Sequence, residues 1–429
     1  MRLADNYQCL IFCYAQLVTK SCMGEVKMNK PTQSKRKGSV LALVMVILVI
    51  MLVMGVGLLS LGQSSRIRAA RTGSEIVARS AADAGLTKAL FEMNEKLKAK
   101  PWTDSNLPNT VAETLPNCDA TLSYTVTVDG NNVYNIESIG SSGQAQKKVK
   151  SSLELDGLFE YAIFVNGILT LMNGTTLDMY NSGAGDTALQ IGTNSTEAGA
   201  VTAKTGVTID GDVIVGPGGD PDTVIDSKLE ANITGDTYPG FKENELSSIT
   251  VPAWLGALPS QGILTGGTTV TTSAKYDNIS LGNSEISAID GAVTLYVTGD
   301  VILDNSAQLL IVDANTNPDA SLTLYLGGNL ISKNGGLINN AAMDPLKVKI
   351  YGLDTCTSID FKTNSVFYGA IYAPNADVQL NAYVEYYGAC TANSFTQNVN
   401  SNFHYDASLR EVGVDDIGVH FVVKQWNEE

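Results

Sequence analysis

The sequence predicts an α+β protein that becomes mostly β toward its C-terminus: a long N-terminal transmembrane helix, a small antiparallel sheet, and then a parallel β-helix or solenoid. Three observations support this prediction. Val40 to Leu59 is a run of twenty residues without a charged or polar side chain. Polar and apolar residues alternate between 121 and 155, as in half-buried strands. From residue 159 onward, short apolar segments led by glycine recur at loosely regular intervals.

These patterns divide the 429 residues into five segments. We expect a leader over 1–38 with Met28 as an alternative start, a transmembrane helix over 39–100, an antiparallel domain over 101–156, a β-solenoid domain over 157–410, and a C-terminal tail over 411–429. A jelly roll or β-sandwich of similar composition is the alternative fold for the largest segment.

Charge is distributed unevenly along the chain, whose formal net charge is −16. Residues 1–38 contain seven basic and two acidic residues, and residues 39–100 contain eight and four, which leaves −25 on the remaining 329 residues. Because such an acidic body repels polyanions, we expect no nucleic-acid partner. Charged residues are only 17% of the chain, against roughly 25% in average soluble domains, which favours short strands and tight turns over a helical enzyme.

The apolar run, which includes Leu43, is long enough to span a membrane. A helix of that length, at about 1.5 Å per residue, crosses a ~30 Å hydrocarbon layer. The alternatives are a buried core helix and a removable secretory signal. Between Arg66 and Lys98 there is no proline, and apolar or small residues recur at steps of three and four, so we expect the helix to continue to Pro101.

Two motifs near the apolar run resemble those of a known family. Lys35-Arg36-Lys37-Gly38 directly precedes the run, as in a type IV prepilin leader. The later stretch Arg79-Ser80-Ala81-Ala82-Asp83-Ala84-Gly85-Leu86 is similar to the Ala-rich A-(E/D)-A-G-L stretch of PilX-type pilus assembly proteins, which have a minor pilin-like N-terminus. The resemblance implies that a prepilin peptidase cuts after Gly38 and that the mature chain begins at Ser39.

The resemblance also implies partners and a location. The partners would be other pilins and minor pilins, the inner-membrane assembly platform and the prepilin peptidase, with the body outside the bacterial inner membrane. Major pilins carry Phe first and Glu fifth after the cut, where this chain has Ser39 and Leu43. The missing carboxylate would pair with a neighbour's N-terminal amine, so the chain suits a minor component, including a tip position.

After the helix, the pattern changes from helix to strand. Alternating segments over 121–128, 132–139 and 145–155, separated by glycine-containing turns, predict three antiparallel strands. Three such strands behind a long helix are the arrangement expected of a pilin-like domain.

The body contains two loose repeats. Glycine-led apolar segments recur at separations of 44, 88 and 29 residues, beginning at Gly167, Gly211, Gly299 and Gly328. An aromatic-Tyr-Gly-Ala motif recurs after 19 residues, at 367–370 and 386–389. Such intervals are typical of a parallel β-helix, in which each coil stacks on the next. Residues 368–380 resemble the solenoid module found behind PilX-type N-termini, with a likeness to bactofilins, while 236–275 fit no repeat.

Three cysteines follow the leader. Cys356 and Cys390 lie in one region of the sequence and can form a disulfide outside the cytoplasm, which would leave Cys118 unpaired. The alternative is that they are small buried residues. Widely spaced cysteines with two histidines do not make a zinc site, so we expect no metal and no cofactor.

Acidic residues raise two chemical hypotheses. Residues 218–222 hint at an oxygen-rich calcium loop, for which solvated turn carboxylates are the alternative. Asp300 with Asp304, or Asp210 with Asp212, could act as the paired carboxylates of a glycan-cleaving β-helix. The nucleophile elbow, Walker loop, zincin helix and dinucleotide fingerprint are missing from the sequence, so we expect a protein without catalytic residues.

Tyrosines gather near the second repeat. They suggest either a strip that binds surface glycans or a stacked ladder inside the solenoid. The five tyrosines are Tyr368, Tyr372, Tyr383, Tyr386 and Tyr387.

The leader motif, the apolar run and the A-D-A-G-L stretch, in that order, predict a minor pilin-like structural component of a type IV pilus or related secretion filament. It would be inserted in the membrane before assembly and would display its solenoid for surface interaction. The alternatives are a membrane-anchored adhesin or scaffold independent of pili, and a polysaccharide-acting β-helix enzyme.

Overall fold

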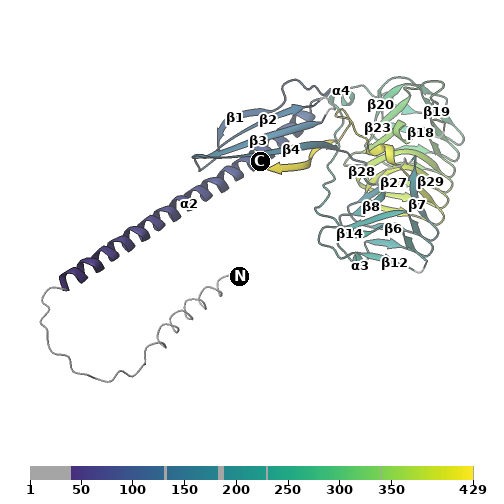
Figure 1. Ribbon diagram of the computed structural model, residues 1–429. Helices are drawn as coiled ribbons and strands as arrows, with labels where there is room; N and C mark the ends of the chain where they lie inside the picture. Colours follow the sequence, from purple (N-terminus) through teal and green to yellow (C-terminus); the bar gives the residue numbers. More distant parts are fainter. Residues whose placement is uncertain (1–39, 130–132, 182–187, 229, 340, 429) are drawn as a thin grey trace. The chain divides into compact units, whose positions relative to one another are not determined.

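A computed structural model of the chain describes residues 40–129, 133–181, 188–228, 230–339 and 341–428 (Figure 1). The chain divides into two compact units, Met1–Gly73 and Ser74–Glu429. The leader and the expected cleavage site between Gly38 and Ser39 lie outside the described residues.

The first described element is α2 (Val40–Leu97), a single helix of 58 residues. Every large apolar side chain from Val40 to Leu61 is exposed. Within the described part of the chain, α2 is the one helix long and apolar enough to cross a membrane. The predicted long apolar N-terminal helix is therefore confirmed.

From Ala78 onward, α2 packs against a sheet through small side chains. A Cβ atom at Gly140 of the sheet would lie 2.0 Å from the Ala78 carbonyl oxygen, and Ser138 Oγ donates to the Ala82 carbonyl at 2.7 Å. The A-D-A-G-L stretch thus lies where helix and sheet approach most closely. The buried residues of α2 are Ala78, Ala81, Ala82, Gly85, Leu86, Ala89, Met93 and Leu97.

The sheet behind α2 is antiparallel and has five strands in the order β1-β2-β3-β4-β31. The strands are β1 (Asn109–Thr114), β2 (Thr121–Val128), β3 (Tyr134–Ser142), β4 (Ala145–Asp156) and β31 (His420–Glu428). Three of them, β2 to β4, were expected. The fifth, β31, lies within 411–429, the segment predicted as a C-terminal tail, and pairs with β4 because Phe421 completes the core next to Trp102 and Tyr134.

A second sheet of 26 strands lies between residues 163 and 406, and its pairings are parallel. Each strand typically pairs with the strand three places later, as β20 does with β23 and β23 with β26. Three successive strands are therefore the repeating unit. The jelly-roll alternative is wrong for these described residues, because it requires antiparallel pairs.

The strands of the first part of the parallel sheet are β5 (Ile163–Val165), β6 (Leu169–Leu171), β7 (Thr176–Tyr180), β8 (Leu189–Thr193), β9 (Val201–Ala203), β10 (Thr208–Ile209), β11 (Gly211–Val215), β12 (Ile225–Ser227), β13 (Asn232–Ile233) and β14 (Thr237–Pro239). Those of the second part are β15 (Ile263–Leu264), β16 (Thr269–Val270), β17 (Ala274–Tyr276), β18 (Asn278–Leu281), β19 (Ile286–Ile289), β20 (Ala292–Val297), β21 (Val301–Leu303), β22 (Gln308–Ile311), β23 (Ser321–Leu326), β24 (Leu330–Ser332), β25 (Leu337–Ile338), β26 (Val348–Gly352), β27 (Ser358–Phe361), β28 (Val366–Leu380), β29 (Glu385–Gln397) and β30 (Asn402–Asp406). The short helices are α3 (Pro221–Val224), α4 (Ala253–Gly256), η1 (Pro345–Lys347) and η2 (Ala407–Arg410).

The strand order in this sheet does not follow the sequence. The last strands pair with the first: β29 with β5 and β6, and β30 with β7. We call this line of pairings the seam. From the seam, β8 to β14 extend one way and β28 down to β15 extend the other, so β14 and β15 lie at opposite ends of the sheet.

Residues 240–262 connect β14 to β15 and cross most of the sheet. Asn194 Nδ2 donates to the Asn244 carbonyl at 2.8 Å, Tyr372 Oη to the Ser247 carbonyl at 2.8 Å, and Lys275 Nζ to the Gly256 carbonyl at 3.3 Å. This crossover explains why 236–275 fit no repeat, since most of that stretch is a connection between the two ends of the sheet.

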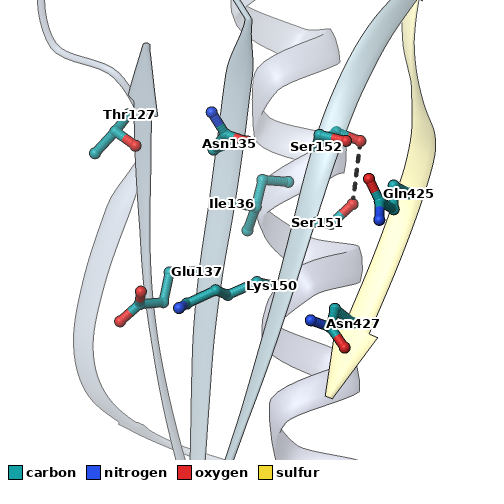
Figure 2. A pocket seen from close by; sticks show the side chains of 9 residues that line it. All are labelled: Thr127, Asn135, Ile136, Glu137, Lys150, Ser151, Ser152, Gln425 and Asn427. Atoms are coloured by element: carbon teal, nitrogen blue, oxygen red, sulfur yellow. Dashed lines mark hydrogen bonds between the residues drawn. The ribbon is translucent and has the colours of Figure 1, made fainter. Parts of the chain in front are cut away.

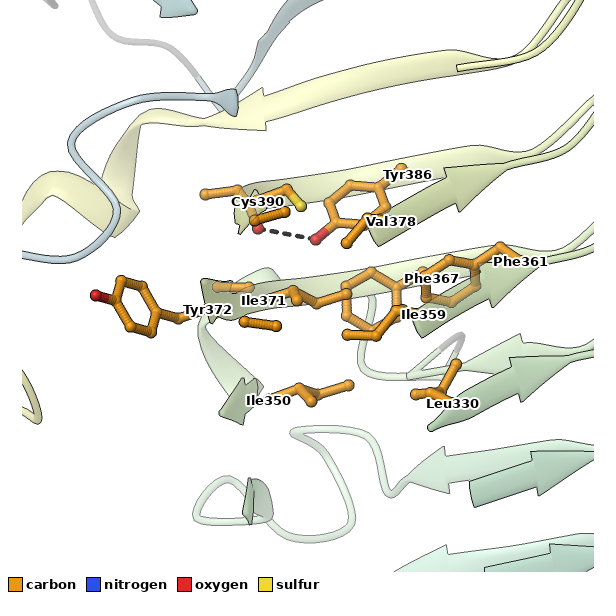
Figure 3. Packing of buried hydrophobic residues seen from close by; sticks show 14 of the residues in the cluster. Leu330, Ile350, Ile359, Phe361, Phe367, Ile371, Tyr372, Val378, Tyr386 and Cys390 are labelled. Atoms are coloured by element: carbon orange, nitrogen blue, oxygen red, sulfur yellow. Dashed lines mark hydrogen bonds between the residues drawn. The ribbon is translucent and has the colours of Figure 1, made fainter. Parts of the chain in front are cut away.

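The core of the parallel sheet is formed by inward-facing side chains that stack in register. The 19-residue repeat is one register step, with Phe367 opposite Tyr386 and Gly369 opposite Gly388. Figure 3 shows Phe367 and Tyr386 among the aliphatic residues of this core. Tyr386 continues the stack onto Phe403, with ring centroids 4.5 Å apart and planes at 12°.

The glycine-led repeats mark corners where successive units of the sheet approach closely. A Cβ atom at Gly328 would lie 2.4 Å from the Gly299 carbonyl carbon, so the position cannot hold a side chain without displacement. Polar side chains at these corners form a chain of hydrogen bonds: Asn278 Oδ1 accepts from Asp300 N at 2.7 Å, and Asp300 Oδ1 accepts from Asn329 N at 2.8 Å. At each of these corners, a side-chain oxygen thus accepts a hydrogen bond from a backbone N–H in the next unit of the sheet.

Cys356 and Cys390 are both buried free thiols. Cys390 lies on β29 between Ile371 and Ile163 of the neighbouring strands, whereas Cys356 precedes β27. The structure therefore lacks the predicted disulfide, because the two residues belong to different units of the sheet and each fills the core separately. Burial raises the pKa of Cys356 to about 11.

Candidate functional site

The exposed half of α2 is the first candidate surface. Val40, Leu43 and Leu59 are exposed by 76%, 62% and 72%. Burying each such side chain would stabilise the protein by roughly 1.5–3 kcal/mol, so a continuous run of them requires an apolar surrounding. The most apolar part of α2 is not buried against any other described residue. This finding argues against the alternative that the apolar run is a buried core helix.

A row of side chains on the outer side of the parallel sheet is the second candidate surface. Tyr368, Tyr387, His404 and Asp178 occupy matching positions on β28, β29, β30 and β7. Tyr387 stacks on Tyr368 with centroids 4.3 Å apart and planes at 7°, and on His404 at 4.5 Å and 22°. We call these four residues the outer row; it crosses the seam between His404 and Asp178.

His404 is held between two carboxylates. Its Nδ1 lies 2.5 Å from Asp178 Oδ1, and its Nε2 lies 3.1 Å from Glu385 Oε2. Burial lowers the pKa of His404, but hydrogen bonds and charge attraction from the two carboxylates outweigh it and raise the pKa to about 9. The imidazole is therefore a cation at neutral pH, with both ring nitrogens donating. It is not available as a general base.

The hydrogen-bond network continues along the seam. Asn402 Nδ2 donates to Glu385 Oε1 at 2.8 Å, and Thr176 Oγ1 donates to Asn402 Oδ1 at 2.5 Å. Thr176 and Asp178 belong to β7, while Glu385 and Asn402 belong to β29 and β30. The network therefore joins the last strands of the sheet to one of the first.

The five predicted tyrosines do not form one binding strip. Tyr372 and Tyr386 are buried, at 1% and 0% exposure, and Tyr383 is in a turn with φ +61°. Only Tyr368 and Tyr387 share the outer row, and both ring faces of Tyr387 are covered by its neighbours. The five tyrosines therefore divide between the two alternatives: Tyr386 stacks on Phe403 inside the core, whereas Tyr368 and Tyr387 stack on each other on the outer side.

The predicted carboxylate pairs each have a structural partner. Asp212 Oδ1 accepts from Asp236 N at 2.8 Å, and Asp210 Oδ1 accepts from Thr234 Oγ1 at 2.8 Å. Asp300 caps a corner, and Asp304 lies 2.5 Å from Lys333 Nζ. These contacts bind neighbouring strands to one another.

The predicted calcium loop contains a helix cap. Asp220 precedes α3, and its side chain accepts from Asp222 N at 3.2 Å and Thr223 Oγ1 at 3.3 Å. Asp226 pairs with Lys228 at 2.6 Å. In the described residues, no group of three or more His, Cys, Asp or Glu side chains is arranged to hold a metal ion.

A hollow of about 310 Å³ lies on the antiparallel sheet and is lined by residues of β2, β3, β4 and β31 (Figure 2). Its lining is mostly polar, and Glu137 and Lys150 point toward each other. The nine lining residues offer hydrogen bonds and one side chain of each charge sign to a polar ligand. They are Thr127, Asn135, Ile136, Glu137, Lys150, Ser151, Ser152, Gln425 and Asn427.

Sequence reasoning overlooked His404, Asp178 and Glu385. The signal for His404 was present: Phe403-His404 follows Tyr386-Tyr387 by 17 residues, as a third aromatic pair after the 19-residue step. Asp178 could not be found this way, because it meets His404 only through the pairing of β30 with β7.

Comparison with known proteins gives a partial family match. A family model described as a domain of unknown function (DUF7305) matches residues 219–412. The sequence has no match among curated proteins.

Three solved structures are similar to the chain at low identity. The competence-associated pilin ComZ from Thermus thermophilus is 12% identical, with a TM-score of 0.26, over 83% of this chain and 97% of that chain. The ice-binding protein LeIBP from an Arctic yeast is 10% identical, with a TM-score of 0.29, over 57% and 90%. An ice-binding protein from an Antarctic Flavobacteriaceae bacterium is 10% identical, with a TM-score of 0.22, over 57% and 80%.

Proposed function

We propose that this chain is a minor pilin-like structural component of a type IV pilus or a related filament system. The observation that carries the proposal is the composition of α2. One continuous helix has an exposed apolar half, Val40 to Leu61, and a half whose small residues pack on an antiparallel sheet. Such a helix can sit in lipid before assembly and against neighbouring apolar helices afterwards.

The body would be a β-solenoid displayed outside the membrane for contact with a surface. The pairing of each strand with the third strand along supports this, because three strands per turn is the period of a three-sided parallel β-helix. The corner ladder of Asn278, Asp300 and Asn329 is what stacked coils require.

The proposed partners are other pilins, the inner-membrane assembly platform and a prepilin peptidase that cuts after Gly38. Leu43 in place of a fifth-position glutamate favours a minor or tip position over the repeating subunit. The proposed role is structural and needs no catalytic residue.

Deletion of the gene, with counting of surface filaments and measurement of twitching, tests this role. We expect filaments to be lost or shortened, and restored by the wild-type chain and by the control Leu52→Met. Leu52→Arg should not restore them, because it places a charge in the middle of the apolar half. Unchanged filaments in the deletion strain would replace the proposal with the membrane-anchored adhesin.

A further inference from the structure

Three arginines on α2 have no partner within the described part of the chain. Arg66, Arg68 and Arg71 are the first charged residues after the uncharged stretch 40–65, and all three are exposed. No ion pair that involves them is found among the described residues, whereas Arg79, further along the same helix, lies 3.1 Å from Glu428. Three cations within six residues therefore face the surroundings of the helix.

Their position fits the surface of a membrane that holds the apolar half. The stretch Val40 to Leu61 covers about 33 Å, enough for the hydrocarbon layer, which places the arginines about 8 to 15 Å beyond it along the axis. Helix side chains lean toward the N-terminus, so long arginine side chains at these positions reach back toward the lipid headgroups.

Their distribution around the helix favours lipid over a single protein partner. At about 100° per residue, Arg66 and Arg68 lie about 160° apart around the helix, and Arg68 and Arg71 about 60° apart. A partner helix would contact one stripe of α2, whereas a plane of headgroups surrounds it. Arginine also matches phosphate geometry with a planar pair of donors.

We propose that Arg66, Arg68 and Arg71 bind the phosphate groups of anionic phospholipids at the membrane surface, at the C-terminal end of the apolar stretch of α2. The contacts fix how deeply α2 sits before it enters a filament. This inference rests on the membrane insertion in the proposed function but not on a role in pili.

The test uses the full chain, reconstituted in vesicles of phosphatidylcholine with phosphatidylglycerol and extracted gently for native mass spectrometry. The wild type should retain phosphatidylglycerol above its share of the vesicle. The triple variant Arg66→Gln/Arg68→Gln/Arg71→Gln should lower this enrichment at least fivefold, since each surface cation contributes about a fivefold preference. The matched control Arg79→Gln, and a triple Lys variant that keeps the charge, should retain most of it.

Equal enrichment in the wild type and the triple Gln variant would overturn the inference. The inference would also be overturned if the triple Gln variant kept its lipid but lost binding to other pilins, because the arginines would then bind an acidic protein partner. Resistance to carbonate extraction, measured on every variant, separates these results from failure of membrane insertion. The two proposals can fail separately. If the wild-type chain is enriched in phosphatidylglycerol but deletion of its gene leaves the pili unchanged, the proposed function is overturned and this inference stands.

Discussion

Asn94 and Phe421, 327 positions apart in sequence, exchange two hydrogen bonds. Asn94 Nδ2 donates to the Phe421 carbonyl at 3.1 Å, and Phe421 N donates to Asn94 Oδ1 at 2.7 Å. One side chain of α2 thus satisfies the backbone at the start of β31. The antiparallel sheet therefore depends on the C-terminus of the chain as well as on the segment that follows α2.

Asn94→Ala should destabilise the antiparallel sheet by about 1–3 kcal/mol, because it leaves two partly buried backbone groups unpaired. Urea unfolding of the full chain in detergent, followed by tryptophan fluorescence, measures this, since Trp102 lies near Phe421. The control is Asn109→Ala, whose side chain makes one exposed hydrogen bond at 3.3 Å. Equal unfolding midpoints for Asn94→Ala and the wild type would contradict the role of this contact.

Phe421→Ala should cost more, about 3–5 kcal/mol, because it opens a cavity between Trp102 and Tyr134. Phe421 is 1% exposed, and its ring lies 5.0 Å from that of Tyr134. Val423→Ala is the matched control on the same strand, since Val423 is 37% exposed. If truncation of the chain at residue 419 left the fluorescence transition unchanged, β31 would not be part of the folded sheet.

Stability of the parallel sheet should fall as pH rises from about 7.5 to about 9.5. The folded-state pKa of His404 is raised from 6.5 to about 9, so its contribution is full below 6.5 and is lost as pH rises through 9. The expected loss is roughly 1–3 kcal/mol. Burial and Asp156 raise the pKa of Glu160 from 4.5 to about 7, so its contribution to stability is lost as pH rises through that range. A pH window that begins at about 7.5 therefore separates the effect of His404 from that of Glu160.

Urea midpoints at both ends of that pH window, for the wild type and for His404→Gln, measure the effect. The variant should show a flat profile between pH 7.5 and 9.5, because glutamine does not titrate. A His404→Gln profile as steep as that of the wild type would assign the pH dependence to another group.

Gly328→Ala should destabilise the parallel sheet by about 1–3 kcal/mol, because its Cβ would lie 2.4 Å from the Gly299 carbonyl carbon and 2.5 Å from Asp300 Oδ1. The clash is with backbone and with the corner hydrogen bond, so a side-chain rotation cannot relieve it. Gly413→Ala, where the nearest atom would be 3.6 Å away, is the control. Thermal unfolding by circular dichroism compares the two, and an equal effect would show that the corner is not tightly packed.

Features set by short-range patterns were predictable from the sequence. The apolar run fixed the position of α2, alternation located β2 to β4, and the 19-residue repeat gave the register of Phe367 with Tyr386. Each of these depends on residues close in sequence or on one register step, which periodicity reveals directly.

Features set by long-range pairing were not predictable. The pairing of His404 with Asp178 depends on residues 226 positions apart, and no local pattern specifies that the last strands of the sheet pair with the first. The short segment 420–428 was likewise predicted as a tail, because nothing near it in sequence indicates that Phe421 packs beside Trp102 and Tyr134. Cys356 and Cys390 suggested a pair because they lie in one region of the sequence, but in the structure both are free thiols.

Mass spectrometry of the mature N-terminus is the most direct test of a prepilin-like chain. In cells with an active prepilin peptidase, the account predicts an N-terminal peptide that begins at Ser39, and the uncut chain in cells without that peptidase. An intact leader ending in Lys35-Arg36-Lys37-Gly38 in cells with the active enzyme would contradict the assignment to a pilus-type filament.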